Sequence, residues 1–294
     1  MSISLRDISF TYATGTAYEM PALSHISLEI PDGQLIGLIG HTGSGKSTLI
    51  QHLNGLLKAD SGIIEYNGRN IYESGYPMTA LRSKVGLVFQ YPEHQLFEMT
   101  VEKDVEFGPA NQGLQPVEVR DRAVSALKQV GLKEKYWNKS PFELSGGQKR
   151  RAAIAGVLAM EPEVLILDEP TAGLDPKGKT SILHHLREIH EERGITIILV
   201  SHCMEDVAAF CERVIVINDG TVAMDGTPKE VFRRHAELEK MGLSAPEVTY
   251  VCEDLKKAGI ALPDGITTVE EARDAILAAY RSGSASGGNT EGTE

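Results

Sequence analysis

Short apolar runs alternate with segments of helical periodicity along most of the chain. At the start, Ile8, Phe10 and Tyr12 occupy every second position, which predicts a half-buried strand over 3–12. Short runs rich in apolar residues predict further strands at 26–30, 35–39, 63–66, 85–90, 164–167, 195–200 and 214–217. A helix over 178–192 separates two of these runs. Strands that alternate with helices indicate an α/β fold, with a largely parallel sheet covered on both faces.

The strand pattern is interrupted between about residues 91 and 160. There Val119, Ala123, Leu127 and Val130 recur at helical spacing, and the series ends at Gly131. We therefore expect a helical subdomain of about 91–160, inserted into a sheet domain that spans 1–230.

The remainder of the chain predicts a small helical extension over 231–281. Val248, Val251, Cys252 and Leu255 form one apolar stripe, and residues 268–271 have the sequence of a capping box. Residues 282–294 lack large apolar side chains and are predicted to be disordered.

Composition narrows the functional classes. The 294 residues are 41% hydrophobic and 24% charged, which is ordinary for a globular protein, but the net charge of −12 argues against a nucleic-acid or anionic-lipid binder. The three cysteines form no C-x-x-C pair, so we expect neither disulfides nor zinc, and a reducing cytosolic setting. No signal-peptide core opens the sequence, and no apolar run approaches the roughly 20 residues that span a bilayer. Any work at a membrane would therefore need another subunit.

A glycine-rich motif, G-x-x-x-x-G-K-[ST], lies between the run at 35–39 and a helical segment that ends near Asn54. Its glycines turn the backbone so that N–H groups point at an anion, and the helix N-terminus adds partial positive charge. Lys46 can reach the β- and γ-phosphates, and the Ser47 hydroxyl can ligate Mg²⁺. We predict that a nucleoside triphosphate binds at Gly40, His41, Thr42, Gly43, Ser44, Gly45, Lys46, Ser47 and Thr48.

Two adjacent carboxylates, Asp168 and Glu169, follow the buried run at 164–167. Side chains that are neighbours in a strand point in opposite directions, so the two carboxylates need different roles. We expect Asp168 to join the Mg²⁺ shell and Glu169 to polarise the attacking water. Without the glycine-rich motif upstream, a solvated acidic strand end would explain the two carboxylates equally well.

A second glycine pair occurs in the stretch 144–148, before a predicted helix. Gly146 and Gly147 expose backbone N–H groups and Ser145 offers a hydroxyl, so the stretch can hold phosphate, although a simple helix cap is the alternative. The basic run 149–151 that follows is interpreted as a solvated helix start. His202 follows the run at 195–200 on the same sheet edge as Asp168 and can donate to a γ-phosphate, while a structural role is the alternative.

The order of these motifs resembles that of the ATPase subunits of ABC transporters, over about residues 3–230. The resemblance implies a P-loop NTPase fold with a RecA-like parallel-sheet core and an N-terminal antiparallel β-subdomain, and it implies ATP and Mg²⁺ as cofactors. Gln90 stands where that family has its Q-loop glutamine, which serves the metal and catalysis. Tyr12 stands where the family has an aromatic that stacks on adenine; packing against Phe10 is the alternative.

The resemblance also implies a head-to-tail dimer in which each chain supplies half of two sites. Six residues would serve one nucleotide, namely Lys46, Ser47, Gln90, Asp168, Glu169 and His202. Four would serve the nucleotide of the other chain, namely Ser145, Gly146, Gly147 and Gln148.

Within the family, the stretch 40–57 looks like the ATPases of energy-coupling-factor importers. Thr42 and Gln51 resemble the second ATPase of the heterodimeric version. This implies a peripheral position on the cytoplasmic face of the cell membrane and uptake of a vitamin or a transition-metal ion. The expected partners are a second ATPase, as heterodimer rather than homodimer, a transmembrane coupling subunit and a membrane substrate-binding subunit, with no nucleic acid. In that family the C-terminal segment joins the two ATPases.

The loop after Gln90 is where the resembled ATPases meet the coupling subunit. We expect Glu93 and Glu98 to pair with basic residues of that subunit and Phe97 to fill a pocket; an ordinary solvated loop is the alternative.

Two other functional classes fit the sequence less well. A soluble ABC ATPase acting on ribosomes or DNA would carry two fused ATPase domains or a long coiled coil, yet only 98 residues separate Lys46 from Ser145. A nucleotide-binding structural subunit without turnover is disfavoured by Glu169.

Overall fold

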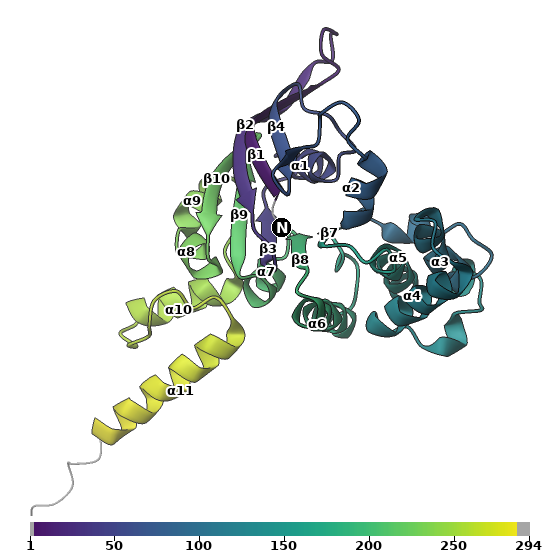
Figure 1. Cartoon of the computed structure of the whole chain (residues 1–294). Helices are drawn as coiled ribbons and strands as arrows, with labels where there is room; N and C mark the ends of the chain where they lie inside the picture. Colours follow the sequence, from purple (N-terminus) through teal and green to yellow (C-terminus); the bar gives the residue numbers. More distant parts are fainter. Residues whose placement is uncertain (1–2, 287–294) are drawn as a thin grey trace, which may run out of the picture.

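Two β-sheets form the centre of the molecule in this computed structural model, which describes residues 3–286 and side chains as far as residue 281 (Figure 1). The first sheet is antiparallel, with the strand order β2-β1-β4-β5. The second has the order β10-β9-β3-β8-β7-β6, in which all neighbours are parallel except the edge strand β10. The strands are β1 (Ile3–Tyr12), β2 (Met20–Ile30), β3 (Leu35–Ile39), β4 (Ser61–Tyr66), β5 (Arg69–Asn70), β6 (Val85–Val88), β7 (Val164–Asp168), β8 (Thr196–Val200), β9 (Arg213–Asn218) and β10 (Thr221–Gly226).

Helices cover the parallel sheet and form the inserted subdomain. The α-helices are α1 (Lys46–Leu53), α2 (Met78–Lys84), α3 (Val101–Asn111), α4 (Pro116–Gln129), α5 (Gly146–Leu158), α6 (Pro176–Arg193), α7 (Met204–Phe210), α8 (Pro228–Phe232), α9 (His235–Lys240), α10 (Glu247–Lys257) and α11 (Val269–Ser286). Short 3₁₀ turns are η1 (Pro92–Gln95), η2 (Glu134–Tyr136) and η3 (Pro141–Glu143). The expected α/β P-loop architecture is confirmed, with α3, α4 and α5 set to one side of the sheets (Figure 1).

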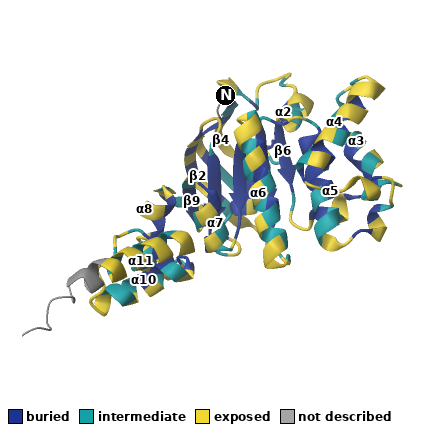
Figure 2. Cartoon of the chain, turned by 90° about the horizontal axis from the view of Figure 1, so that it is seen from below, coloured by how far each residue is buried: buried dark blue, intermediate teal, exposed yellow. Residues whose placement is uncertain are grey.

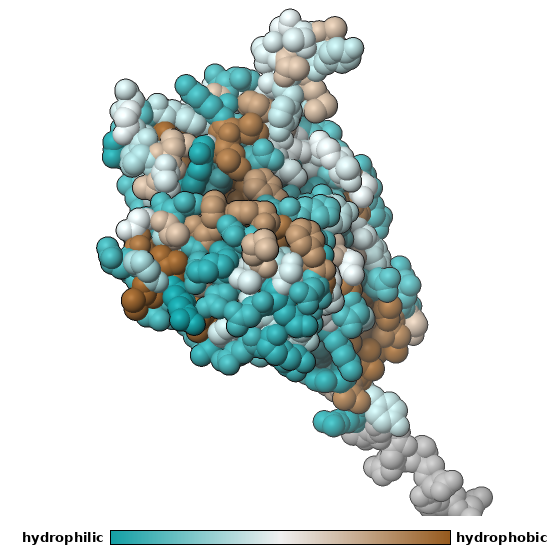
Figure 3. All heavy atoms as spheres, turned by 90° about the vertical axis from the view of Figure 1, so that its right-hand side faces the viewer, coloured by the Kyte–Doolittle hydropathy of each residue, from teal (hydrophilic) through white to brown (hydrophobic). Residues whose placement is uncertain are grey.

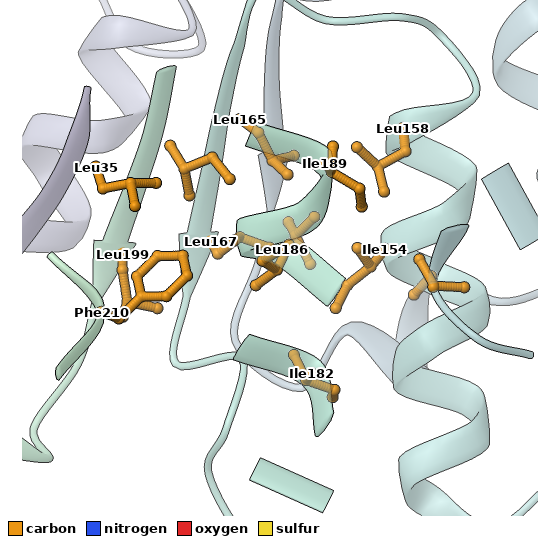
Figure 4. Packing of buried hydrophobic residues seen from close by; sticks show 14 of the residues in the cluster. Leu35, Ile154, Leu158, Leu165, Leu167, Ile182, Leu186, Ile189, Leu199 and Phe210 are labelled. Atoms are coloured by element: carbon orange, nitrogen blue, oxygen red, sulfur yellow. The ribbon is translucent and has the colours of Figure 1, made fainter. Parts of the chain in front are cut away.

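Alternation along the parallel strands divides the interior into two cores. In β7, Leu165 and Leu167 face one core, whereas Val164 and Ile166 face the other. The first core lies against α5, α6 and α7, and Figure 4 shows its leucines packed on Ile154, Ile182, Leu186 and Phe210 of those helices. The second core lies on the opposite face of the parallel sheet, which packs against α1 and the antiparallel sheet. Because both faces are covered, the central strands are buried throughout (Figure 2).

Strands β10 and β2 differ from the sequence expectation. β10 was not predicted, because its apolar run is only three residues long, Val222 to Met224, and among its residues only Met224 is buried. β2 begins at Met20 rather than near 26, because its first residues pair with β1 through Tyr12↔Met20 and Thr11↔Pro21 without being buried. Backbone pairing with a neighbouring strand, rather than burial of side chains, therefore defines β10 and the first part of β2.

The C-terminal extension departs from prediction in three details. Val251 of the predicted apolar stripe is 54% exposed, while Cys252 is buried. The Thr268 hydroxyl accepts from the Glu271 N–H at 3.3 Å, as a capping box requires, but the Glu271 carboxylate accepts from the Thr267 N–H at 3.0 Å. Helix α11 continues to Ser286, beyond the predicted start of disorder at 282, and residues 287–294 of that predicted tail lie outside the described residues.

Between residues 3 and 286, no helix combines the length and apolar character needed to cross a membrane.

Candidate nucleotide-binding site

The glycine-rich loop joins β3 to α1 in a conformation that only glycine permits at two positions. Gly45 precedes α1 with φ of 107°, and a Cβ there would lie 2.5 Å from the Ala22 carbonyl oxygen. At Gly40, a Cβ would collide with the Ile217 carbonyl oxygen and the Ser44 hydroxyl. The loop is therefore fixed tightly against β9 and β2, with the N-terminus of α1 at its end.

The two polar side chains at the start of α1 point into this loop and toward β7. The Lys46 ammonium is buried and donates to the carbonyl oxygens of Gly40 at 2.6 Å and His41 at 2.9 Å. Burial lowers the pKa of Lys46, while Glu169 and Asp168 act in the opposite direction. The Ser47 hydroxyl lies 3.4 Å from Oδ2 of Asp168. The structure thus places Lys46, predicted to bind phosphate, beside Ser47 and Asp168, two of the three predicted Mg²⁺ ligands.

Asp168 and Glu169 stand at the carboxyl end of β7 and are both buried. Burial raises the pKa of Asp168, and the Ser47 hydrogen bond and Lys46 oppose it. Burial, followed by the Asp168 charge, raises the pKa of Glu169 to about 7. Glu169 directly follows Asp168, the last residue of β7, and has a left-handed backbone conformation with φ of 54°.

His202 follows β8, the neighbour of β7, at the same edge of the sheet. Its Nε2 lies 3.5 Å from Oε1 of Glu169. Burial, followed by the Lys46 charge, lowers the pKa of His202. Gln90 lies two residues beyond β6, on the other side of β7, and is exposed. Three adjacent strands therefore deliver Gln90, the carboxylates and His202 to one edge, where α/β sheets bind their ligands.

The remaining predicted loop residues border this cluster. The His41 imidazole lies 3.4 Å from the Asp219 carboxylate, and Gly43 and Thr42 are exposed at the tip of the loop. The Tyr12 hydroxyl lies 3.1 Å from the Thr48 hydroxyl. The Tyr12 ring also packs edge-on against Phe10 with centroids 4.8 Å apart, which is the alternative considered for this residue.

The second glycine motif caps α5. Ser145 and Gln148 form a capping box, in which the Gln148 side chain accepts from the Ser145 N–H at 3.0 Å and the Ser145 hydroxyl accepts from the Gln148 N–H at 3.4 Å. Gly146 is exposed, and a Cβ there would meet nothing. A hollow of about 430 Å³ beside this cap is lined by the motif and by residues 172–175, and by none of residues 40–48. The motif is thus not part of the phosphate loop of its own chain.

Two buried polar atoms of the site lack a hydrogen-bond partner. The Ser44 hydroxyl and Oε1 of Glu169 are buried without a hydrogen-bond partner. Asp168, Ser47 and Gln90 offer oxygen atoms, the ligands that Mg²⁺ prefers. The site therefore has unmet donors and acceptors where ATP and Mg²⁺ are expected.

Comparison with known proteins is consistent with this geometry. The model of the family described as ABC transporter matches residues 23–172. The chain belongs to the ABC transporter ATPase family. It is 53% identical to an energy-coupling factor transporter ATP-binding protein, EcfA2, of Caldanaerobacter subterraneus, covering 94% of this chain and 97% of that one.

Two solved structures of ABC transporter ATPases are also similar. One is cbiO1 of Clostridium perfringens, described as part of the complex cbiONQ, with 42% identity, a TM-score of 0.73 and coverage of 85% of this chain and 98% of that one. The other is an ATP-binding cassette solved as a dimer with ADP and phosphate, with 31% identity, a TM-score of 0.70 and coverage of 76% and 98%. ATP binding and hydrolysis follow from membership of this family, and none of these proteins favours the soluble alternative.

One expectation about charged residues near the site was wrong. The run 149–151 is not a solvated helix start: Arg150 is buried, and a guanidinium N–H of Arg151 donates to the Val130 carbonyl. The Arg150 guanidinium lies 3.4 Å from the Glu93 carboxylate, and the expected pairing of Glu93 with a coupling subunit stays a prediction.

Three further residues near the site were not singled out from the sequence. Thr171 is buried and donates to Asp206 at 2.9 Å, and Asp104 accepts from two backbone N–H groups of the loop after Gln90. Their polar side chains near the motifs could have marked them as candidates in the sequence. Their hydrogen-bond partners, however, become apparent only in the folded structure.

Proposed function

We propose that this chain is the ATP-hydrolysing subunit of an energy-coupling-factor importer, which energises uptake of a vitamin or a transition-metal ion. The observation that carries the proposal is the cluster of Lys46, Ser47, Asp168, Glu169 and His202 at one sheet edge. EcfA2 proteins about half identical to this chain, over almost its whole length, support the importer class.

Within one site, the phosphate loop holds the triphosphate. The backbone N–H groups of the loop and the Ser44 hydroxyl bind phosphate oxygens, and Lys46 leaves its two carbonyl acceptors to bind the β- and γ-phosphates. Ser47, Gln90 and Asp168 would hold Mg²⁺, which would neutralise charge on the phosphates. Tyr12 stacks on adenine after exchanging its contact with Thr48.

Glu169 is the base in this proposal. Its Oε1 has no hydrogen-bond partner and faces His202, so a water held between Glu169 and the γ-phosphate can lose its proton to that oxygen. His202 then contacts the γ-phosphate from the neighbouring strand.

A second ATPase completes the site. The Ser145 motif caps α5 in the inserted subdomain, whereas the phosphate loop precedes α1, and the two helices lie apart in Figure 1. The exposed cap of one chain therefore covers the nucleotide held by the other, and the dimeric cassette with bound ADP and phosphate supports this pairing. The extension 231–281 adds a second contact between the chains through exposed Val251, Val269 and Leu277, with a different ATPase as the partner.

A groove on the inserted subdomain docks the transmembrane coupling subunit. It has a volume of about 380 Å³ and is lined by residues of α2, α3, α5 and the loop after Gln90. Phe97 is 59% exposed and packs edge-on against Phe107 with centroids 5.0 Å apart, and Figure 3 shows apolar side chains gathered across this face. The occupant is an amphipathic cytoplasmic helix whose basic residue pairs with Glu98. Docking of this helix in the groove holds the chain at the cytoplasmic face of the membrane, beside the substrate-binding subunit.

Purification of the tagged chain from membranes tests the assignment. We expect a second ATPase and a polytopic subunit to co-purify, and the reconstituted complex to accumulate its substrate only with hydrolysable ATP. Recovery of ribosomal proteins, or uptake that proceeds equally without ATP, would contradict the proposal.

A further inference from the structure

Arg150 is a buried cation of α5 that contacts two separate segments, the turn 170–172 and η1. One guanidinium N–H group donates to the carbonyl oxygens of Pro170, at 3.3 Å, and of Ala172. Another lies 3.4 Å from Oε2 of Glu93 in η1. Burying a guanidinium costs free energy unless its charge is paired, so α5, η1 and the turn 170–172 cannot move independently without a cost.

The turn that Arg150 contacts is held on its other side as well. The Thr171 hydroxyl donates to Oδ2 of Asp206 at 2.9 Å, and Asp206 belongs to α7, which begins two residues after His202. The turn 170–172 is thus clamped between α5 and α7. Glu169 directly precedes this turn and adopts a left-handed conformation, with φ of 54°. Such a conformation persists when its surroundings fix it.

We propose that Arg150 is a positioning residue that transmits the position of η1 to the turn 170–172 and thereby to Glu169. The inference rests on the proposed function, because η1 leads directly into the docking loop at Phe97. When the transmembrane subunit docks and shifts η1, the Glu93 carboxylate moves with it. The Arg150 guanidinium follows this carboxylate, and its two contacts with the Pro170 and Ala172 carbonyls carry the shift to the turn. Coupling of this kind runs through contiguous packed and hydrogen-bonded groups.

The test compares three variants in the complete complex reconstituted in proteoliposomes, with ATP hydrolysis and uptake measured together. Glu93→Gln removes the counter-charge and keeps the volume. Arg150→Lys keeps the charge but loses the planar fork that reaches two carbonyls and a carboxylate. Glu118→Gln is the matched control, since Glu118 pairs with Arg122 at 2.8 Å on α4, away from these motifs.

We expect the first two variants to keep the KM for ATP within about twofold and to lower both kcat and the uptake per ATP hydrolysed about five- to tenfold. The double variant should lose no more than the larger single loss, because both changes break the same connection. The control should match the wild type. If Arg150→Lys fails to fold, Glu93→Gln decides, because Glu93 is only partly buried and its loss leaves both carbonyl contacts intact.

Two results would overturn the inference: wild-type uptake per ATP in Glu93→Gln, or losses that simply add in the double variant. Failure of the proposed function is distinguishable, because the wild-type complex itself would then show no ATP-dependent uptake.

Discussion

Oε1 of Glu169 lies 3.5 Å from Nε2 of His202, across the gap between two adjacent parallel strands. The Glu169 N–H donates to the Val200 carbonyl oxygen at 3.0 Å, so the two strand ends are joined at this point. The carboxylate and the imidazole therefore face one small volume from two sides, at the edge where Lys46 also lies.

The first prediction concerns Glu169→Gln. Gln cannot accept the proton of the attacking water, so ATP turnover of the assembled complex should fall by about 10²–10⁴-fold while ATP stays bound. Turnover is measured by phosphate release and occupancy by retained labelled nucleotide. The control is Glu188→Gln, which changes a carboxylate that faces His184 and His185 on α6. Turnover within tenfold of the wild type would remove Glu169 from the role of base.

The second prediction uses the same variant without nucleotide or metal, in EDTA. The pKa of Glu169 is raised from 4.5 to about 7, so the folded state binds a proton that the unfolded state releases between these values. The free energy of unfolding therefore falls as pH rises from about 4.5 to 7, and the ionised carboxylate costs at most about 3 kcal/mol above pH 7. Glu169→Gln should raise the melting temperature at pH 8 and have little effect at pH 4.5. An equal effect at both pH values would contradict this.

The third prediction concerns the Ser47 hydroxyl, 3.4 Å from Asp168. Ser47→Ala should raise the Mg²⁺ concentration for half-maximal hydrolysis by about 10–100-fold, because an oxygen ligand is lost. Binding of a fluorescent ATP analogue in EDTA should stay unchanged, since Lys46 and the loop N–H groups remain. The control is Thr180→Ala, which removes a hydroxyl that donates to the Pro176 carbonyl on α6, outside the docking groove. Unchanged Mg²⁺ dependence would exclude Ser47 as a ligand.

The sequence predicted those parts of the fold that depend on local pattern. The buried strand that ends in Asp168 and the loop before Lys46 are recognisable because apolar runs and glycine spacing are continuous along the chain. Arg150 could not be placed in this way. A basic residue at a helix start is usually solvated. The burial of Arg150 depends on carbonyls 20 and 22 residues further along the chain and on the Glu93 carboxylate, 57 residues before it. Edge strand β10 was missed because pairing, rather than burial, defines it.

The last prediction concerns the docking groove. The buried Asp104 carboxylate accepts from the N–H groups of Phe97, at 3.0 Å, and Glu98, at 2.8 Å, and so fixes the loop that presents the Phe97 ring. Phe97→Ala should weaken binding of the coupling subunit by about 2–4 kcal/mol, as for a central aromatic of an interface.

Asp104→Ala tests the same groove through the loop alone. It should also release the coupling subunit, because the loop loses its acceptor although the Phe97 ring is kept. Both variants should bind ATP normally, since the phosphate loop lies outside the groove. The control Val117→Ala changes a residue of α4 that is 74% exposed and does not line the groove. Co-purification is the measurement. A transmembrane subunit that remains at wild-type stoichiometry with both groove variants would place the docking surface elsewhere.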